Sequence, residues 1–466
     1  MVDAKDVNFD AANLPPAQSV GVDIINTNLD NFERFEQIAS STIKPIGYKP
    51  HFKLDYLANT GVGASVGGRF GSGISGGVQG IFSDILGRNQ IYTTVAINGQ
   101  IYDFGGQFAY MNQDSRINWG AGISHIPYIT GYQNFERIGN GGAYARNNDI
   151  IRTFEERAQV FGSYPFSKVH RFELGGSLAY YSYRIERQQS IFTPGQFAEF
   201  YPYKKISKEE ASDSYGFPFN NLKVGGLDFA FVGDNSYFGI TSPLSGFRYR
   251  IGASQQAGDY RYGSVLTDVR KYARFKPLTF AARIYTNTTF GRDQDQYYSQ
   301  QFIGYPTLIR GYEYQSFNKI GDANTAGFNL YQLVGSKVAV ANFEIRLPFT
   351  GPEKLAAIES GFLLSDLNLF FDIGLAYDNN SKVAFKSTPG GIGLMDDPFF
   401  VKDPLKPNEL APQVPRYYER VPAMSAGVSL RVNVFGYFII EPYLAIPFQR
   451  KDVKGGVIGV NLAPGW

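Results

Sequence analysis

Strict alternation of apolar and polar residues over about ten positions is the feature that most constrains how this chain can fold. In residues 367–376 every second side chain, beginning with Leu367, is aliphatic or aromatic. The positions between them carry Asn368, Phe370, Asp372 and Gly374. Residues 341–349 and 425–434 repeat the pattern, with Glu344, Arg346 and Arg431 on their polar faces. A period of two predicts strands whose two faces meet different surroundings.

The surroundings of these strands follow from the kind of residue on each face. One face is almost purely aliphatic and aromatic, and the other holds charged and small residues, which is typical of a strand between lipid and a wet lumen. Composition agrees, because 39 Phe, 32 Tyr and 52 Gly accompany only 18% charged residues. The chain also has no uninterrupted apolar run of about 18 residues, which excludes helical spans. Only a closed barrel then satisfies every backbone group in lipid. The alternative fold is a soluble all-β sandwich.

The spacing of the alternating segments predicts an all-β transmembrane antiparallel barrel of about 16 strands, within the range known for bacterial outer membranes. Connections after the fifth, seventh, eleventh and thirteenth strands are expected to be long. Most others are short, such as those at Ser167 and Pro277. Short turns on one rim and long loops on the other are typical of such barrels. The expected strands are residues 51–60, 71–83, 89–98, 103–112, 117–126, 149–163, 171–187, 221–239, 245–257, 261–274, 278–290, 335–349, 366–377, 424–435, 437–448 and 456–464.

An arginine stands in the long connection after the eleventh expected strand, within FIGYPTLIRGYEY. If this loop folds back into the lumen, Arg310 can reach Glu344, Asp372 or both, because its planar fork binds carboxylates at two points. Gly311 would let the backbone approach the wall closely, and Tyr312 would pack beside it. The plainer alternative is that all three charges are ordinary solvated lumen groups.

These residues carry a resemblance to a known family. Ile309-Arg310-Gly311-Tyr312 resembles the (V/I)-R-G-(F/Y) motif on the sixth external loop of the BamA/TamA/FhaC superfamily, a bacterial surface antigen family of assembly and translocation barrels. Phe370 to Gly374 resembles the F-x-D-x-G signature of its thirteenth strand, with Asp372 at the centre. Glu344 matches the acidic residue of the twelfth strand, and Trp466 resembles the aromatic C-terminal signal of outer-membrane proteins.

The resemblance implies a sixteen-stranded barrel whose first and last strands meet at a seam thought to open laterally. Members insert or translocate proteins in the bacterial outer membrane, so nascent outer-membrane or surface proteins, outer-membrane lipids and a periplasmic domain or accessory subunits are the expected partners. The seam would lie between the segment beginning at His51 and residues 457–466. The competing function is an outer-membrane pore or transporter for solutes on the same barrel, because a fold alone does not fix a function.

The chain is expected to divide into residues 1–50, an N-terminal extension or remnant of a periplasmic region, and residues 51–466, the barrel. Residues 1–50 are too few for the POTRA domains of BamA-type members, and their first sixteen residues lack a signal peptide. The barrel also resembles those fused behind TolB-like β-propellers. An N-terminal region removed from the chain, or a separate partner that captures substrate, would each explain the short start.

Catalysis, cofactors and metals find no support in the sequence. The chain has no cysteine, its three histidines lack metal-ligand spacing, and no nucleophile is paired with a base. A glycine-rich stretch, residues 61–77, lacks the G-K-[ST] ending of a phosphate loop. The net charge of +2 comes from interspersed charges and gives no basis for nucleic-acid binding. We therefore expect no enzyme, no cofactor and no metal site.

Overall fold

The computed structural model divides the chain into two compact units, Met1–His51 and Phe52–Trp466. Most of the N-terminal segment predicted over residues 1–50, and Trp466, lie outside the described residues. The structure describes residues 48–59, 63–68, 71–97, 103–138, 143–215, 219–295, 299–313, 316–317, 328, 330–390, 392–396, 413–417, 419–434, 436, 438–450, 453 and 455–462.

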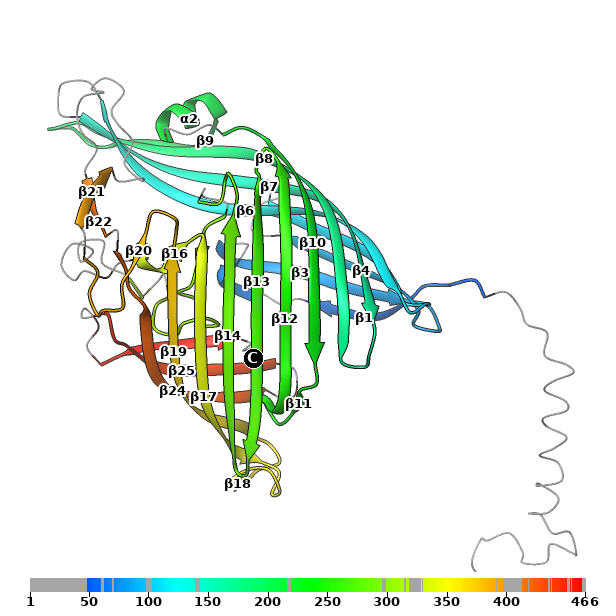
Figure 1. Ribbon diagram of the computed structural model, residues 1–466. Coiled ribbons are helices and arrows are strands. Elements are labelled where there is room, and N and C mark those ends of the chain that lie inside the picture. Colours follow the sequence, from blue (N-terminus) through cyan, green and yellow to red (C-terminus); the bar gives the residue numbers. More distant parts are fainter. Residues whose placement is uncertain are drawn as a thin grey trace, which may run out of the picture. The chain divides into compact units, whose positions relative to one another are not determined.

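The second unit is built on one large sheet whose long strands run antiparallel and pair in chain order (Figure 1). β1 (Lys53–Asn59) and β2 (Gly63–Gly68) both pair with β3, so together they make one interrupted first strand. With it, the described residues form sixteen strands, as predicted. The others are β3 (Gly71–Ser83), β4 (Asn89–Ile97), β5 (Phe104–Asn112), β6 (Asn118–Ile138), β7 (Ala143–Pro165), β8 (His170–Phe192), β10 (Leu222–Asp234), β12 (Pro243–Gly258), β13 (Tyr262–Phe275), β14 (Leu278–Phe290), β17 (Lys337–Gly351), β19 (Leu364–Tyr377), β24 (Ala423–Val434), β25 (Phe438–Pro447) and β26 (Val457–Leu462).

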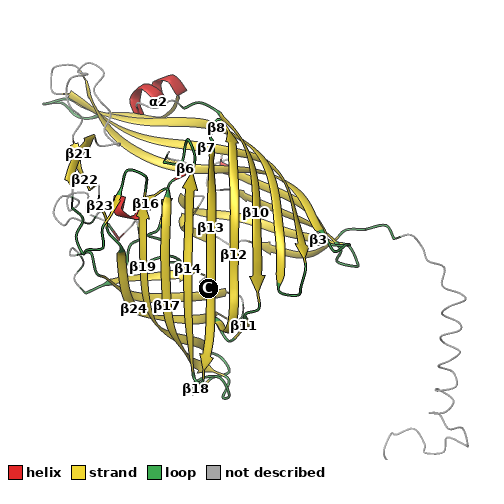
Figure 2. Ribbon diagram, viewed as in Figure 1, coloured by secondary structure: helices red, strands yellow, loops and turns green. Residues whose placement is uncertain are grey.

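Shorter elements belong to the connections, and strands make up nearly all of the regular structure (Figure 2). No helix in the described part of the chain is long and apolar enough to cross a bilayer. The short elements are β9 (Glu199–Ile206), α2 (Lys208–Tyr215), β11 (Tyr237–Phe238), β15 (Gln301–Phe302), the 3-10 helix η6 (Leu330–Leu333), β16 (Val334–Gly335), β18 (Ile358–Glu359), β20 (Lys382–Val383), β21 (Ile392–Asp396), β22 (Gln413–Tyr417) and β23 (Glu419–Arg420).

The two faces of the strands differ in exposure as the alternation predicts. On β17, Phe343 and Ile345 are exposed, whereas Glu344 and Arg346 are almost fully buried. On β19, Leu369 is exposed and Asp372 is fully buried. The apolar face therefore lies on the outside, toward lipid, and the polar face lies inside the barrel.

The long connections predicted after the seventh, eleventh and thirteenth strands are confirmed, but the one predicted after the fifth strand is wrong. β6 and β7 remain paired from Asn118↔Ser163 to Ile138↔Ala143, so only residues 139–142 connect them. The sequence misled because residues 127–148 lose the apolar-outside pattern that marks a bilayer-spanning strand. Strands of 21 and 23 residues greatly exceed the 9 to 11 that a bilayer requires. Their outer parts therefore extend beyond the lipid, where both faces can be polar.

The connection from β14 to β17 folds onto the inner face of the wall. Ile303, Ile309 and Tyr312 from this connection form a buried cluster with Val338 and Val340 of β17, Ala376 of β19 and Ala423 of β24. The guanidinium of Arg283 on β14 donates from Nη1 to the carbonyl of Thr307 at 2.9 Å. The long loop is thus packed inside the barrel, as predicted.

The sheet has two ends within the described part of the chain. β26 pairs with β25 on one side, and the first strand pairs with β3. No backbone pairing between described residues joins the first strand to β26. Among the residues that the structure describes, these two strands are therefore the edges of the sheet.

Candidate functional site

Arg310 lies at the centre of a buried ionic cluster inside the barrel. Its Nε donates to Oδ2 of Asp372 at 2.8 Å, and its Nη2 donates to Oδ1 of the same carboxylate at 2.8 Å. The backbone N–H of Arg310 also donates to Asp372 Oδ2, at 3.2 Å. This two-point geometry is the strongest arrangement available to an arginine and a carboxylate. It holds the loop backbone as well as its side chain against β19.

Two further carboxylates reach the same guanidinium. Nη1 of Arg310 donates to Glu344 Oε1 of β17 at 2.9 Å and to Glu441 Oε1 of β25 at 3.1 Å. Arg346 Nε donates to Glu344 Oε2 at 2.8 Å, and Arg431 Nη2 lies 3.0 Å from the same oxygen. Each of these side chains is at most 2% exposed.

The cluster is balanced in formal charge. Three guanidiniums face three carboxylates: Arg310, Arg346 and Arg431 against Glu344, Asp372 and Glu441. Buried charges are tolerated when each is paired and hydrogen-bonded, and removal of one leaves its partner uncompensated. The cluster therefore behaves as a unit that links the loop to β17, β19, β24 and β25.

The motif residues beside Asp372 shape the space that the loop occupies. The Arg310 guanidinium stands over the Phe370 ring at 3.6 Å, a close cation–π contact. A Cβ on Gly374 would come within 2.3 Å of Ile309 Cδ1, so a larger residue would collide with the loop. Gly311 has φ of +88°, in the left-handed region that glycine adopts at least cost.

Tyr312 ties the loop to the C-terminal strands. Its hydroxyl lies 3.0 Å from the Met424 carbonyl oxygen and 2.5 Å from Gln449 Oε1, and its one proton can be donated to either oxygen. Gln449 in turn accepts from the Met424 N–H at 2.8 Å. Arg450 binds the next part of the loop through Nη2, which donates to the Ser316 carbonyl at 2.8 Å. The loop is therefore fastened at β24 and just beyond the end of β25 as well as at the ionic cluster.

The structure brings together six of the residues singled out from the sequence: Arg310, Glu344, Asp372, Phe370, Gly374 and Ile309. In the sequence, Arg346 and Arg431 stand out only as polar-face residues, and no motif marks Glu441. Alternation places Glu441 on the same face of β25 as Tyr443 and Ala445, and Glu441 is the one acidic residue of that strand. An acidic residue alone on the inward face is a sequence signal that could have marked Glu441 as a partner of Arg310. No pattern in the sequence indicates Gln449, since it lies beyond the strand.

The groups of the buried cluster are chemically suited to holding parts of the structure together. Arginine supplies no proton at ordinary pH, and each carboxylate of the cluster is held by a guanidinium. Across the described residues, no group of three or more His, Cys, Asp or Glu side chains is placed to hold a metal ion. The arrangement can hold a loop in a fixed place within the lumen.

A sixteen-stranded antiparallel sheet, apolar outside and polar inside, with an arginine-bearing loop packed against its inner wall, defines a transmembrane β-barrel. Residues 84–457 match the Omp85 superfamily domain, and the chain belongs to that superfamily. It is thus a protein of the bacterial outer membrane, within a class devoted to membrane assembly and transport rather than to enzymatic reactions.

Three solved structures are similar to this chain at low sequence identity. BamA from Haemophilus ducreyi lacking POTRA domains 1-3 has a TM-score of 0.47 and 14% identity, over 88% of this chain and 69% of that one. CdiB from Acinetobacter baumannii has a TM-score of 0.44 and 11% identity, over 87% of this chain and 57% of that one. CdiB from Escherichia coli has a TM-score of 0.42 and 11% identity, over 93% of this chain and 69% of that one. No curated protein matches the chain.

Proposed function

We propose that this protein inserts or exports outer-membrane or surface proteins by opening a lateral seam between its first strand and β26. Its substrates would be nascent outer-membrane or surface proteins, delivered by a periplasmic domain or accessory subunits. The internal loop would hold the wall beside the seam in a defined state.

The two edge strands support this proposal. β26 has six residues, Val457–Leu462, and carries exposed Ile458 and Val460. An edge strand presents unpaired N–H and C=O groups that can template an incoming strand. A short edge strand forms few backbone hydrogen bonds across a seam, and so costs little to separate.

A chain of polar contacts from the loop to the last strand is the observation that carries the proposal. Arg310 contacts Glu441 on β25, and Glu441 Oε2 accepts from Asn461 Nδ2 of β26 at 3.3 Å. Glu441 Oε1 also accepts from Ser429 Oγ of β24 at 2.7 Å. The loop thus reaches the edge of the sheet through one intermediate side chain, so its position and the freedom of β26 are coupled.

A reversible lock across the seam tests the proposal. The chain contains no cysteine, so Tyr56→Cys on β1 and Val460→Cys on β26 can be joined selectively by bismaleimides, or by bis-methanethiosulfonates whose disulfide links a reductant cleaves, of several lengths. We expect the joined protein to lose assembly of outer-membrane proteins and to regain it when a cleavable link is cut. The matched control is Val265→Cys with Thr288→Cys, a pair facing each other on β13 and β14 far from the seam, which should leave assembly intact.

Two outcomes of this experiment would overturn the proposal of a seam that opens. A protein joined across β1 and β26 that assembles substrates at the normal rate does not need to open there. Failure of every reagent length to join the two cysteines would mean that these strands do not meet.

The competing function, a solute pore, is less well supported because the internal loop occupies lumen space. Ile303, Ile309 and Leu333 of the β14–β17 connection are completely buried against the wall. Depletion of the full-length protein in its native cell separates the two functions. Loss of several unrelated outer-membrane or surface proteins before growth fails would support assembly or export. An unchanged outer-membrane proteome with impaired uptake of one solute would support transport.

A further inference from the structure

Lys271 is a charged residue on the lipid-facing side of the barrel. It lies on β13 between Val269 and Ala273, which share its face, and it is exposed. Its cross-strand partners are Phe247 on β12 and Ala282 on β14. No hydrogen bond or ion pair joins Lys271 to another residue that the structure describes. An ionisable side chain within a bilayer-facing surface is a candidate functional group.

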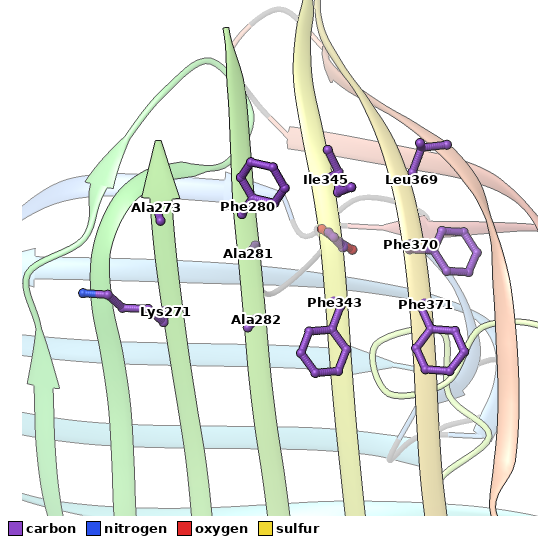
Figure 3. A pocket seen from close by; sticks show the side chains of 11 residues that line it. Lys271, Ala273, Phe280, Ala281, Ala282, Phe343, Ile345, Leu369, Phe370 and Phe371 are labelled. Atoms are coloured by element: carbon purple, nitrogen blue, oxygen red, sulfur yellow. The ribbon is translucent and has the colours of Figure 1, made fainter. Parts of the chain in front are cut away.

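A groove of about 520 Å³ runs beside Lys271 on the same outer face (Figure 3). The strand register explains it. One row across β13, β14, β17 and β19 reads Lys271, Ala282, Phe343 and Phe371, and the next row reads Ala273, Phe280, Ile345 and Leu369. The small alanines leave a hollow between larger side chains. Its volume falls within the range of about 300 to 1,000 Å³ found for small-ligand sites.

The position of the groove along the strand sets its depth in the membrane. β13 ends at Phe275, and a two-residue turn leads to β14, so this is the rim of short turns, which faces the periplasm. Lys271 lies four residues before that end, which is about 13 Å along the strand. Because barrel strands are tilted, its depth below the rim is smaller than this distance. A lysine stem can cover such a depth by extending toward the interface with its ammonium group outermost.

We propose that the groove and Lys271 bind one glycerophospholipid of the periplasmic leaflet, with an acyl chain over Ala273 and Ala282 and the phosphate on the Lys271 ammonium. The outer face of an outer-membrane barrel is covered by lipid, and a lone cation beside an apolar hollow complements an amphiphile with an anionic head. Basic pockets at the membrane interface bind phosphate head groups in the same way.

Lipid binding to the purified full chain in dodecyl maltoside tests this. The probes are phosphatidylglycerol and a diacylglycerol with the same acyl chains but no phosphate. We expect the wild-type protein to bind phosphatidylglycerol at least fivefold more tightly than diacylglycerol. Lys271→Ala should abolish that preference, and Lys271→Arg should keep it. Ala282→Leu, which fills the groove, should weaken binding of both lipids at least threefold.

The matched control is Ala253→Leu on β12, an exposed alanine on the lipid-facing side but outside the groove, and it should bind both lipids as the wild type does. Because all three positions face lipid rather than the lumen, the four variants should keep the folded, heat-modifiable band on gels. An unchanged preference for phosphatidylglycerol in Lys271→Ala would overturn the phosphate site. Unchanged binding of both lipids in Ala282→Leu would overturn the acyl-chain site.

Discussion

Arg310 and Asp372, 62 positions apart in the chain, form a fork-to-fork ion pair with two N–O distances of 2.8 Å inside the barrel. The pair joins a long connection to the middle of a strand that spans the membrane. Since both side chains are withdrawn from water, the pair is effective only while the rest of the cluster stays assembled.

Arg310→Ala should destabilise the barrel by about 3 to 5 kcal/mol, the usual cost of leaving a buried carboxylate without its partner. The measurement is urea unfolding in lipid vesicles, together with the fraction of heat-modifiable protein. Arg88→Ala is the matched control, because Arg88 pairs with Asp114 at an exposed position and should matter little. Equal stability of the two variants would argue against an internal brace.

Asp372→Asn removes one negative charge from the balanced cluster, and we expect a loss similar to that of Arg310→Ala. The double variant restores neutrality, so its loss should be smaller than the sum of the single losses by about 0.5 to 3 kcal/mol. A double-mutant cycle on unfolding free energies measures this coupling. Strict additivity would mean that the two residues act independently.

Gly374→Ala should destabilise the protein by about 1 to 3 kcal/mol, because the added methyl group meets Ile309 in a packed core. Ile309→Val removes Cδ1, the atom that the added methyl group would meet. On its own it should cost about 0.5 to 1.5 kcal/mol, as such truncations do. In the Gly374→Ala background, it should instead be neutral or stabilising. If Ile309→Val lowered the free energy of unfolding equally in the wild type and in Gly374→Ala, the contact between position 374 and Ile309 would not limit stability.

Tyr312→Phe should cost about 0.5 to 1.5 kcal/mol, because it removes the buried hydroxyl that hydrogen-bonds the oxygens of Met424 and Gln449, each of which keeps another donor. Urea midpoints again provide the measurement. Tyr237→Phe serves as the control, since Tyr237 is exposed on β11 and its hydroxyl can be replaced by water contacts. A loss no greater than that of the control would mean that the hydroxyl does not hold the loop.

The fold was predictable where one strand face meets lipid. Alternation revealed β17, β19 and β24 because lipid on one side and polar groups on the other impose a period of two. The same rule failed for residues 127–138 of β6 and 143–148 of β7, since both faces of these extensions lie outside the bilayer. The strand then lacks the contrast that the pattern detects.

The candidate site was predictable only in part, for a related reason. Local motifs marked Arg310 and Asp372, because the loop arginine, the flanking glycine and the strand carboxylate each appear in a short stretch. They did not mark Glu441, which looks in the sequence like any inward-facing polar residue.

By itself, then, the sequence determined the class of barrel, its strand number and the residues of the arginine loop, because these depend on periodicity and short-range motifs. The tertiary structure alone decided that Arg310 meets three carboxylates, that Gly374 makes room for Ile309, and that Lys271 stands beside a hollow. Those relationships depend on strand register and loop packing, which bring together residues far apart in the chain.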